Sequence, residues 1–87
     1  GVLICGTGIG VSIAANKIPG VRAALAGDPF SGQMAGAHNN AQILCLGARV
    51  VGVGLAKATF DAYHGATFEG GRHQRRVDKI HLPESVS

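Results

Sequence analysis

The sequence predicts an α/β domain built on a parallel β-sheet, because short apolar runs alternate with helix-like segments along the chain. The 87 residues suffice for one domain with one core. Hydrophobic residues make up 46% of the chain and charged residues 15%, a composition typical of a folded protein rather than a disordered one. Since parallel strands need right-handed crossovers and helices on both faces, the alternation favours a layered sheet of three strands.

Three apolar segments are predicted to form the strands. Residues 2–5 are a continuous apolar run that ends at Gly6, as expected of a strand buried on both faces. Residues 21–26 make the second strand, and residues 42–46 make the third, which is closed by Gly47.

The first two helices have clear boundary signals. Residues 9–17 are predicted to be helical up to the Pro-Gly pair that begins at Pro19. Asp28 is a good N-cap, and Pro29 suits the first helical position, so the second helix should cover residues 30–37.

The C-terminal part is predicted with weaker signals. Residues 53–64 should form a third helix, with Gly65 after its end, and residues 72–80 have helical character. We therefore expect a single domain over residues 1–81 and a flexible tail over residues 82–87.

Composition excludes several classes of protein. The longest apolar runs, at 21–26 and 50–56, are far shorter than the roughly 20 residues that span a bilayer. No secretory signal pattern is present, so we expect a cytoplasmic protein that does not bind membranes. Cys5 and Cys45 lie far apart without metal-ligand spacing, which predicts free thiols and no metal site.

Charge and aromatic content indicate the kind of partner. The net charge is +3, and the one basic cluster lies within residues 72–79. There is no tryptophan and only one tyrosine, so the chain lacks the stacking platforms of a single-strand nucleic-acid binder. A small anion is the expected partner, rather than a nucleic acid.

A glycine-rich turn joins the first predicted strand to the first predicted helix. It reads Cys-Gly-Thr-Gly-Ile-Gly over residues 5–10. Glycine lets the backbone approach a ligand closely, and the N–H groups at a helix N-terminus favour negative charge. The turn therefore predicts an anion site, although a tight turn that needs glycine only for its dihedrals explains the same residues.

Two known glycine motifs fit this turn poorly. A dinucleotide-binding GxGxxG that starts at Gly6 would need glycine where the chain has Val11. Asp28 lies where a ribose-binding acid belongs, but its role as a helix cap is sufficient. No Gly-Lys-Ser/Thr follows the turn, which excludes a P-loop.

Cys5 is the candidate base or nucleophile. It stands at the carboxyl end of a strand, where open α/β sheets bind ligands, and a helix N-terminus lowers the pKa of a thiol. A cysteine in an apolar strand is also an ordinary core residue, and both interpretations remain open from the residues alone. Cys45 lies earlier in its strand and is interpreted as core.

Further polar residues are candidates. His38 and Asn39 end the second helix, either as functional groups or as a solvated C-cap pair. Guanidinium groups match phosphate oxygens, so the candidate phosphate ligands are Arg49, Arg72, Arg75 and Arg76. The run from Arg72 is equally typical of a solvated basic face.

Four segments together resemble the ribose-5-phosphate isomerase B family, which also contains the galactose-6-phosphate isomerase subunits. In chain order they are CGTGIGVSIAANK at 5–17, HNN at 38–40, GARVVG at 47–52 and FEGGRHQRRV at 68–77. The resemblance covers residues 2–80, and the shared order makes it more specific than any single segment.

The resemblance implies a reaction and a set of site residues. The reaction is a metal-free, cofactor-free isomerisation of ribose 5-phosphate to ribulose 5-phosphate through an enediolate. Cys5 matches the family's base, which agrees with Val11 standing where other members carry a glutamate. The remaining matches are the oxyanion-binding N–H groups of Gly6, Gly8, Ile9 and Gly10, the ring-opening residues Thr7 and His38, the sugar contact Asn39, and the phosphate ligands Arg49, Arg72 and Arg76.

The resemblance also implies a fold and an assembly. The fold is a three-layer Rossmann-like α/β sheet, and the active unit is a homodimer or tetramer whose sites are shared between neighbours. Family members begin with a strand that ends in an Asp-His pair, and this dipeptide is absent here. We therefore expect a three-strand remnant that lacks the N-terminal strands and is weakly active or inactive alone. The alternative is a phosphate- or nucleotide-binding module without catalysis.

Overall fold

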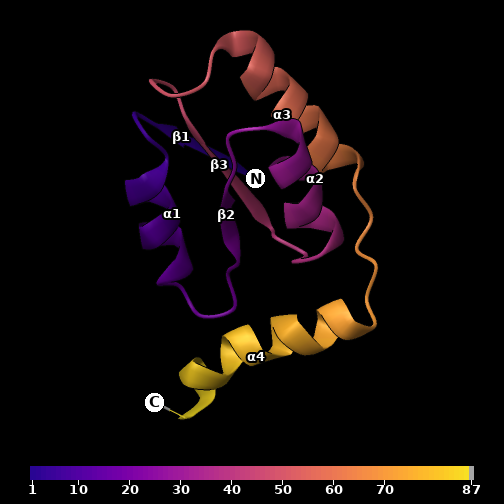
Figure 1. The fold of residues 1–87 in the computed structure, drawn as a ribbon. Coiled ribbons are helices and arrows are strands. Elements are labelled where there is room, and N and C mark those ends of the chain that lie inside the picture. Colours follow the sequence, from indigo (N-terminus) through magenta and orange to yellow (C-terminus); the bar gives the residue numbers. More distant parts are fainter. Residues whose placement is uncertain (87) are drawn as a thin grey trace.

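Three parallel strands form the centre of the molecule (Figure 1). The computed structural model describes the backbone of residues 1–86 and the side chains of residues 1–81. Strands β1 (Val2–Cys5), β2 (Ala23–Leu25) and β3 (Ile43–Gly47) pair in the order β1-β3-β2. The last strand in the chain is thus the middle strand of the sheet, and the predicted parallel α/β architecture is confirmed.

Helices cover both faces of this sheet. Helix α1 (Ile9–Asn16) lies on one side, and α2 (Pro29–Ala37) and α3 (Val53–Gly65) lie together on the other (Figure 1). Helix α4 (Arg72–Val86) runs across the far end of the molecule, away from the sheet. The chain crosses from β1 to β2 at the opposite border and then returns to β3 in the middle, so two right-handed crossovers place their helices on opposite faces.

The start of α2 shows how sequence determines a boundary. The Asp28 carboxylate accepts the backbone N–H of Ser31 at 2.8 Å and its hydroxyl at 2.9 Å. These hydrogen bonds lower the pKa of Asp28, because they favour the charged form of the carboxyl. Pro29 is the first helical residue, so the predicted cap and start are confirmed.

Other boundaries differ from prediction by a few residues. Strand β2 is shorter than 21–26, because the Arg22 N–H donates to the side chain of Gln42 at 2.7 Å and regular pairing starts later. Helix α3 includes Gly65, which was expected to follow its end, and the φ of Gly65 is not in the left-handed region. Helix α4 continues past residue 80 into the expected tail, of which Ser87 lies outside the described residues.

The core lies between the sheet and α3. Leu44 and Cys45 in the middle strand are fully buried, and Phe60 packs against the core from α3. No helix among the described residues is long and apolar enough to cross a bilayer.

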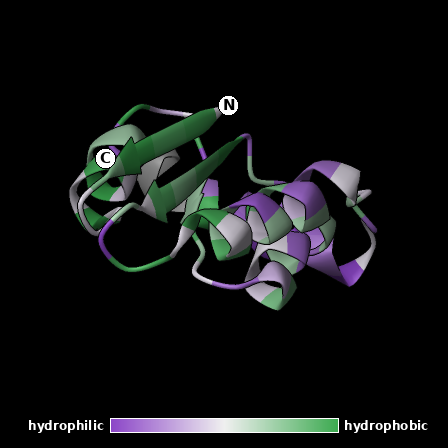
Figure 2. Cartoon of the chain, turned by 90° about the horizontal axis from the view of Figure 1, so that it is seen from above, coloured by the Kyte–Doolittle hydropathy of each residue, from purple (hydrophilic) through white to green (hydrophobic). Residues whose placement is uncertain are grey.

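The border of the sheet at β1 is exposed and apolar. Figure 2 shows this hydrophobic strand, next to the N-terminus, along the outside of the molecule. Ile4 is 62% exposed. A groove of about 440 Å³ runs beside it, lined by Val2 and Ile4 from β1 and by residues of α3 that include Phe60.

Candidate active site

The loop after β1 places a sulfur at the N-terminus of α1. Gly8 is the N-cap of this helix and has a φ of 81°, a left-handed conformation that favours glycine. Its N–H donates to the Cys5 Sγ at 3.2 Å. The side chain of Cys5 is half-buried, so its sulfur combines amide contacts with access from solvent.

The two cysteines have opposite electrostatic environments. Backbone N–H groups, of Val11 first and then of Gly8, lower the pKa of Cys5 because they stabilise the thiolate. Burial raises the pKa of Cys45, and the nearby charge of Cys5 raises it further. Both thiols are free, as predicted, and the core position of Cys45 is confirmed.

The glycine loop is held against the end of β3. The Thr7 hydroxyl accepts the N–H of Ile9 at 3.2 Å, and the backbone of Thr7 lies so close to Gly47 that a Cβ at that glycine would clash. The Arg49 N–H donates to the carbonyl of Gly6 at 2.8 Å, and a Cβ on Gly6 would lie 3.5 Å from the Arg49 side chain. The guanidinium of Arg49 therefore lies beside the loop.

A second polar region surrounds the beginning of α4. It is a cavity of about 450 Å³, and its lining is cationic or aromatic in character: His38, Arg72, His73, Arg75, Arg76 and Lys79. We call it the cationic cavity. Arg72 and Arg76 share this cavity, and His38 joins them from the end of α2.

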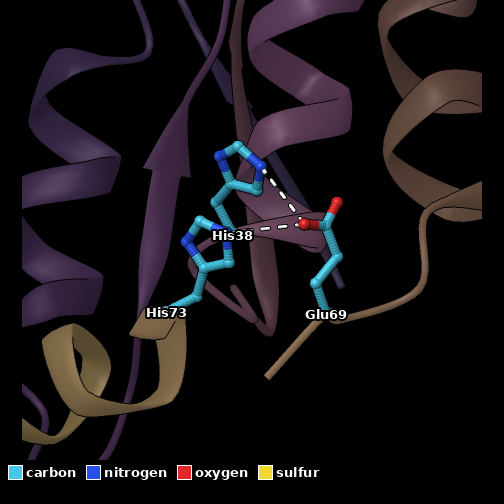
Figure 3. Close-up of side chains that lie close together, drawn as sticks. All are labelled: His38, Glu69 and His73. Atoms are coloured by element: carbon cyan, nitrogen blue, oxygen red, sulfur yellow. Dashed lines mark ion pairs between the residues drawn. The ribbon is translucent and has the colours of Figure 1, made fainter. Parts of the chain in front are cut away.

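Three side chains at this cavity form a compact cluster (Figure 3). The rings of His38 and His73 stack with centroids 4.0 Å apart and an interplanar angle of 10°. The Glu69 Oε1 lies 3.7 Å from the Nε2 of His38 and 3.4 Å from the Nε2 of His73. One carboxylate oxygen thus contacts both imidazoles.

The buried member of this cluster favours its neutral form. His73 is 5% exposed, and burial lowers its pKa, followed by the effect of His38 and of the guanidinium groups of Arg76 and Arg72. Glu69 acts in the opposite direction. A guanidinium nitrogen of Arg76 also contacts the Nδ1 of His73.

The same cluster is the candidate for a metal site among the described residues. One ligand atom from each of His38, Glu69 and His73 lies within 4.8 Å of the others. The surroundings fit a cation poorly, because the cavity already holds the guanidinium groups of Arg72 and Arg76.

The predicted site residues fall into two groups at opposite edges of the sheet. Cys5 ends a strand and lies at the carboxyl edge, with the glycine loop and Arg49. His38 follows a helix that runs back against the strands, so it lies at the amino edge with α4 (Figure 1). Asn39 is exposed and borders a separate cavity of about 300 Å³. One chain therefore does not bring Cys5 and the cationic cavity together.

Sequence reasoning missed two members of the cluster, Glu69 and His73. Both lie in the segment 68–77, and His73 directly follows a candidate arginine. Their position at the site depends on a contact between distant segments, since the Glu69 N–H donates to the Ala37 carbonyl at 2.9 Å. The segment at 68–77 could have pointed to both residues, because it contains them next to the candidate arginines.

Comparisons with known proteins agree on one family. Residues 1–80 match the family model described as Ribose/Galactose Isomerase. Over 80 residues the chain is 55% identical to ribose-5-phosphate isomerase B of Escherichia coli, covering 92% of this chain and 54% of that protein. It is 52% identical to the D-erythrulose-4-phosphate isomerase of Pectobacterium atrosepticum, with 92% and 53% covered.

Solved structures give the same result. Ribose-5-phosphate isomerase B of Clostridium thermocellum superposes with a TM-score of 0.97 at 51% identity, covering 99% of this chain and 58% of that one. The Mycoplasma genitalium enzyme with bound ribulose-5-phosphate gives a TM-score of 0.96 at 48% identity, with 100% and 57% covered.

The matches also show how much of each relative's length this chain covers. This chain spans about half the length of the curated relatives it matches. Within that span the β1–α1 loop next to Cys5 and the start of α4 with Arg72 and Arg76 are both present. The chain belongs to the Ribose/Galactose Isomerase family, to which ribose-5-phosphate isomerase B also belongs.

Proposed function

We propose that this chain is the catalytic portion of an aldose–ketose isomerase that interconverts ribose 5-phosphate and ribulose 5-phosphate through an enediolate. Membership of the family and the names of similar proteins support this substrate class. One observation carries the assignment of the chemistry: the Cys5 sulfur accepts the Gly8 N–H at the N-terminus of α1, where a base and oxyanion donors can act together.

Cys5 is the proposed base. Its thiolate removes the C2 proton of the open-chain aldose and returns it to C1, and amide donors of the loop stabilise the enediolate oxygen. A positioned base contributes about 10²–10⁴-fold, and oxyanion donors often contribute more. The lowered pKa of Cys5 supplies the thiolate nearer to neutral pH. The oxyanion donors we assign are the N–H groups of Gly6, Gly8, Ile9 and Gly10.

The remaining assigned residues prepare and hold the substrate. Phosphate requires several donors in a fixed arrangement, which the guanidinium groups around the cationic cavity supply. Ring opening needs a proton donor at the ring oxygen, which an imidazole provides. We assign ring opening to Thr7 and His38, a sugar hydroxyl contact to Asn39, and phosphate binding to Arg49, Arg72 and Arg76.

We propose that the active unit is a homodimer or tetramer with shared sites. The loop of Cys5 and the cationic cavity lie at opposite edges of one chain, so a common substrate requires the two edges to come from different copies. Because the chain spans about half the length of the curated relatives it matches, we expect the 87 residues alone to be weakly active or inactive. Free thiols favour a reducing compartment, and we place the reaction in the cytoplasm.

The test is a chimera in which residues 1–80 replace the matching segment of the Escherichia coli relative. Formation of ribulose 5-phosphate is followed for the parent chimera and for Cys5→Ala and Cys45→Ala variants. We expect the Cys5 variant to lose at least about 10²-fold in kcat, the contribution of a base. Cys45→Ala is the matched control, because Cys45 is a fully buried thiol on the neighbouring strand.

Two outcomes would contradict the proposal. A parent chimera that binds inorganic phosphate but forms no ketose would favour a binding module without catalysis. A Cys5→Ala chimera with unchanged kcat would show that Cys5 is not the base, although the assignment as an isomerase would stand.

A further inference from the structure

We propose that Glu69 is the positioning residue for His38, and that His73 and Arg76 hold Glu69 in place for this role. The inference rests on the proposed function, since it concerns the ring opening assigned to His38. The observation behind the inference is that one carboxylate oxygen of Glu69 contacts the Nε2 atoms of both imidazoles (Figure 3).

Arg76 determines which nitrogen of His73 carries the proton. A guanidinium has only donors, so the Nδ1 of His73 that it contacts must act as the acceptor. The neutral ring then carries its proton on Nε2, which lies 3.4 Å from the Glu69 carboxylate. His73 therefore directs an N–H at Glu69 rather than a lone pair.

Burial and backbone contacts fix this arrangement. His73 is 5% exposed and stacks on His38, so its ring has little freedom to rotate. The Glu69 N–H donates to the Ala37 carbonyl at 2.9 Å, which ties the loop before α4 to the residue that precedes His38. The exposed carboxylate of Glu69 is thus anchored at its backbone and at its oxygen.

The consequence for His38 is a defined orientation. Its Nε2 faces Glu69 at 3.7 Å, and within residues 1–81 no side chain bonds its Nδ1. In the protonated ring, Glu69 pairs with the Nε2 proton and leaves the Nδ1 proton for a substrate. His38 also borders the cationic cavity, where the phosphate end of the same substrate would bind.

Ring opening uses that proton in a balanced step. The C1–O4 bond of the furanose breaks, its electron pair goes to O4, and the Nδ1 proton of His38 joins O4. The O1–H electron pair forms the aldehyde C=O, and the O1 proton goes to water. Nothing is oxidised or reduced, and His38 regains its proton from water.

An aldose that cannot form a ring separates this role from a structural one. 4-Deoxyribose 5-phosphate lacks O4 and has O5 esterified, so it stays acyclic, while its length and phosphate are unchanged. A residue that acts only on ring opening affects ribose 5-phosphate and spares the acyclic analogue. A residue that supports the fold affects both.

The kinetic test uses the same chimera with Glu69→Gln and Asp61→Asn. Asp61→Asn is the matched control, because Asp61 is an exposed carboxylate on α3 that does not belong to the cluster of His38, Glu69 and His73. We expect Glu69→Gln to lower kcat/KM for ribose 5-phosphate at least tenfold, less than the roughly 10²–10⁴-fold contribution of a complete acid or base because His38 itself remains. We expect kcat/KM for the analogue to change less than about twofold. An equal loss on both substrates, or none on either, would overturn the inference.

A second readout needs no turnover. Nitrogen-15 spectra of the histidine side chains in the 87-residue chain report which ring nitrogen carries a proton. We expect His73 protonated on Nε2, and a change in the His38 signals in Glu69→Gln but not in Asp61→Asn. A His73 ring protonated on Nδ1 contradicts the inference. If the parent chimera is inactive while the spectra are as expected, the proposed function fails and the positioning geometry stands.

Discussion

Cys5 and Cys45 show how strongly local environment separates two chemically identical side chains. They lie on neighbouring strands, one at the end of β1 and the other in the middle of β3. Cys5 receives amide hydrogen bonds that favour its thiolate, whereas Cys45 is fully buried and its charged form is disfavoured. Only Cys5 combines access with an activated sulfur.

Alkylation with iodoacetamide tests this difference in the folded chain. We expect Cys5 to react and Cys45 to remain unmodified. Because amide contacts lower the pKa of Cys5, its rate should rise with pH and level off below the ordinary thiol pKa of about 8.5. Peptide mass spectrometry identifies the labelled residue. Labelling of Cys45 at a similar rate, or a midpoint at or above the ordinary value, would contradict the prediction.

At the residue scale, the sequence indicated Cys5 but not Glu69. Cys5 is followed at once by the glycine turn that activates it, so its environment is local in the chain. Glu69 contacts His38, which lies 31 positions earlier, and a single sequence carries no trace of that proximity. Long-range contacts of this kind become visible only in the folded molecule.

Among the elements, helices α2 and α3 approach each other so closely that there is no room for a side chain between them. A Cβ on Gly32 would lie 2.6 Å from the carbonyl oxygen of Thr59, which is itself fully buried. The Thr59 hydroxyl donates to the Leu55 carbonyl at 2.7 Å, so this side chain is also fixed. The two helices depend on glycine for their close approach.

Substitution of Gly32 by alanine should therefore destabilise the fold. We expect a loss of about 1–3 kcal/mol in the free energy of unfolding, typical of an overpacked site. Gly54→Ala is the control, because a methyl group added to Gly54 in α3 would meet no atom within 4 Å, and alanine there favours the helix. Urea unfolding followed by circular dichroism measures both. Equal midpoints for the two variants would show that α2 and α3 can separate at no cost.

For the helices, the first residue was easier to predict from the sequence than the last residue. Asp28 and Pro29 define the beginning of α2 through local hydrogen bonds and a fixed φ, so the sequence contains the whole signal. The end of α3 was misplaced because Gly65 permits a left-handed cap without requiring one. Instead, the Ala66 N–H bonds to the Tyr63 carbonyl at 3.2 Å.

The whole molecule carries its candidate residues on two opposite edges. Strand ends and helix ends of a parallel α/β sheet point in opposite directions, which separates Cys5 from His38 within one chain. The order of the motifs along the sequence does not reveal this separation. It follows only from the alternation of strands and helices, which the sequence does predict.

Mixing experiments test the proposed sharing of sites. In the chimera, Cys5→Ala and His38→Asn should each be inactive as pure assemblies. Randomly mixed dimers of the two should regain about a quarter of the parent activity, since half are mixed and each mixed dimer has one intact site of two. The control mixes His38→Asn with Arg76→Ala, which affect the same edge, and should show no recovery. Absence of recovery in the first mixture would indicate that each chain completes its own site.

The opposed edges have a consequence for how the activity scales with amount. If one substrate must be held by two polypeptides, a solution diluted below the dissociation constant of their association loses rate faster than it loses protein. Specific activity then becomes a measure of self-affinity, and anything that loosens the assembly acts as an inhibitor without ever touching the sugar.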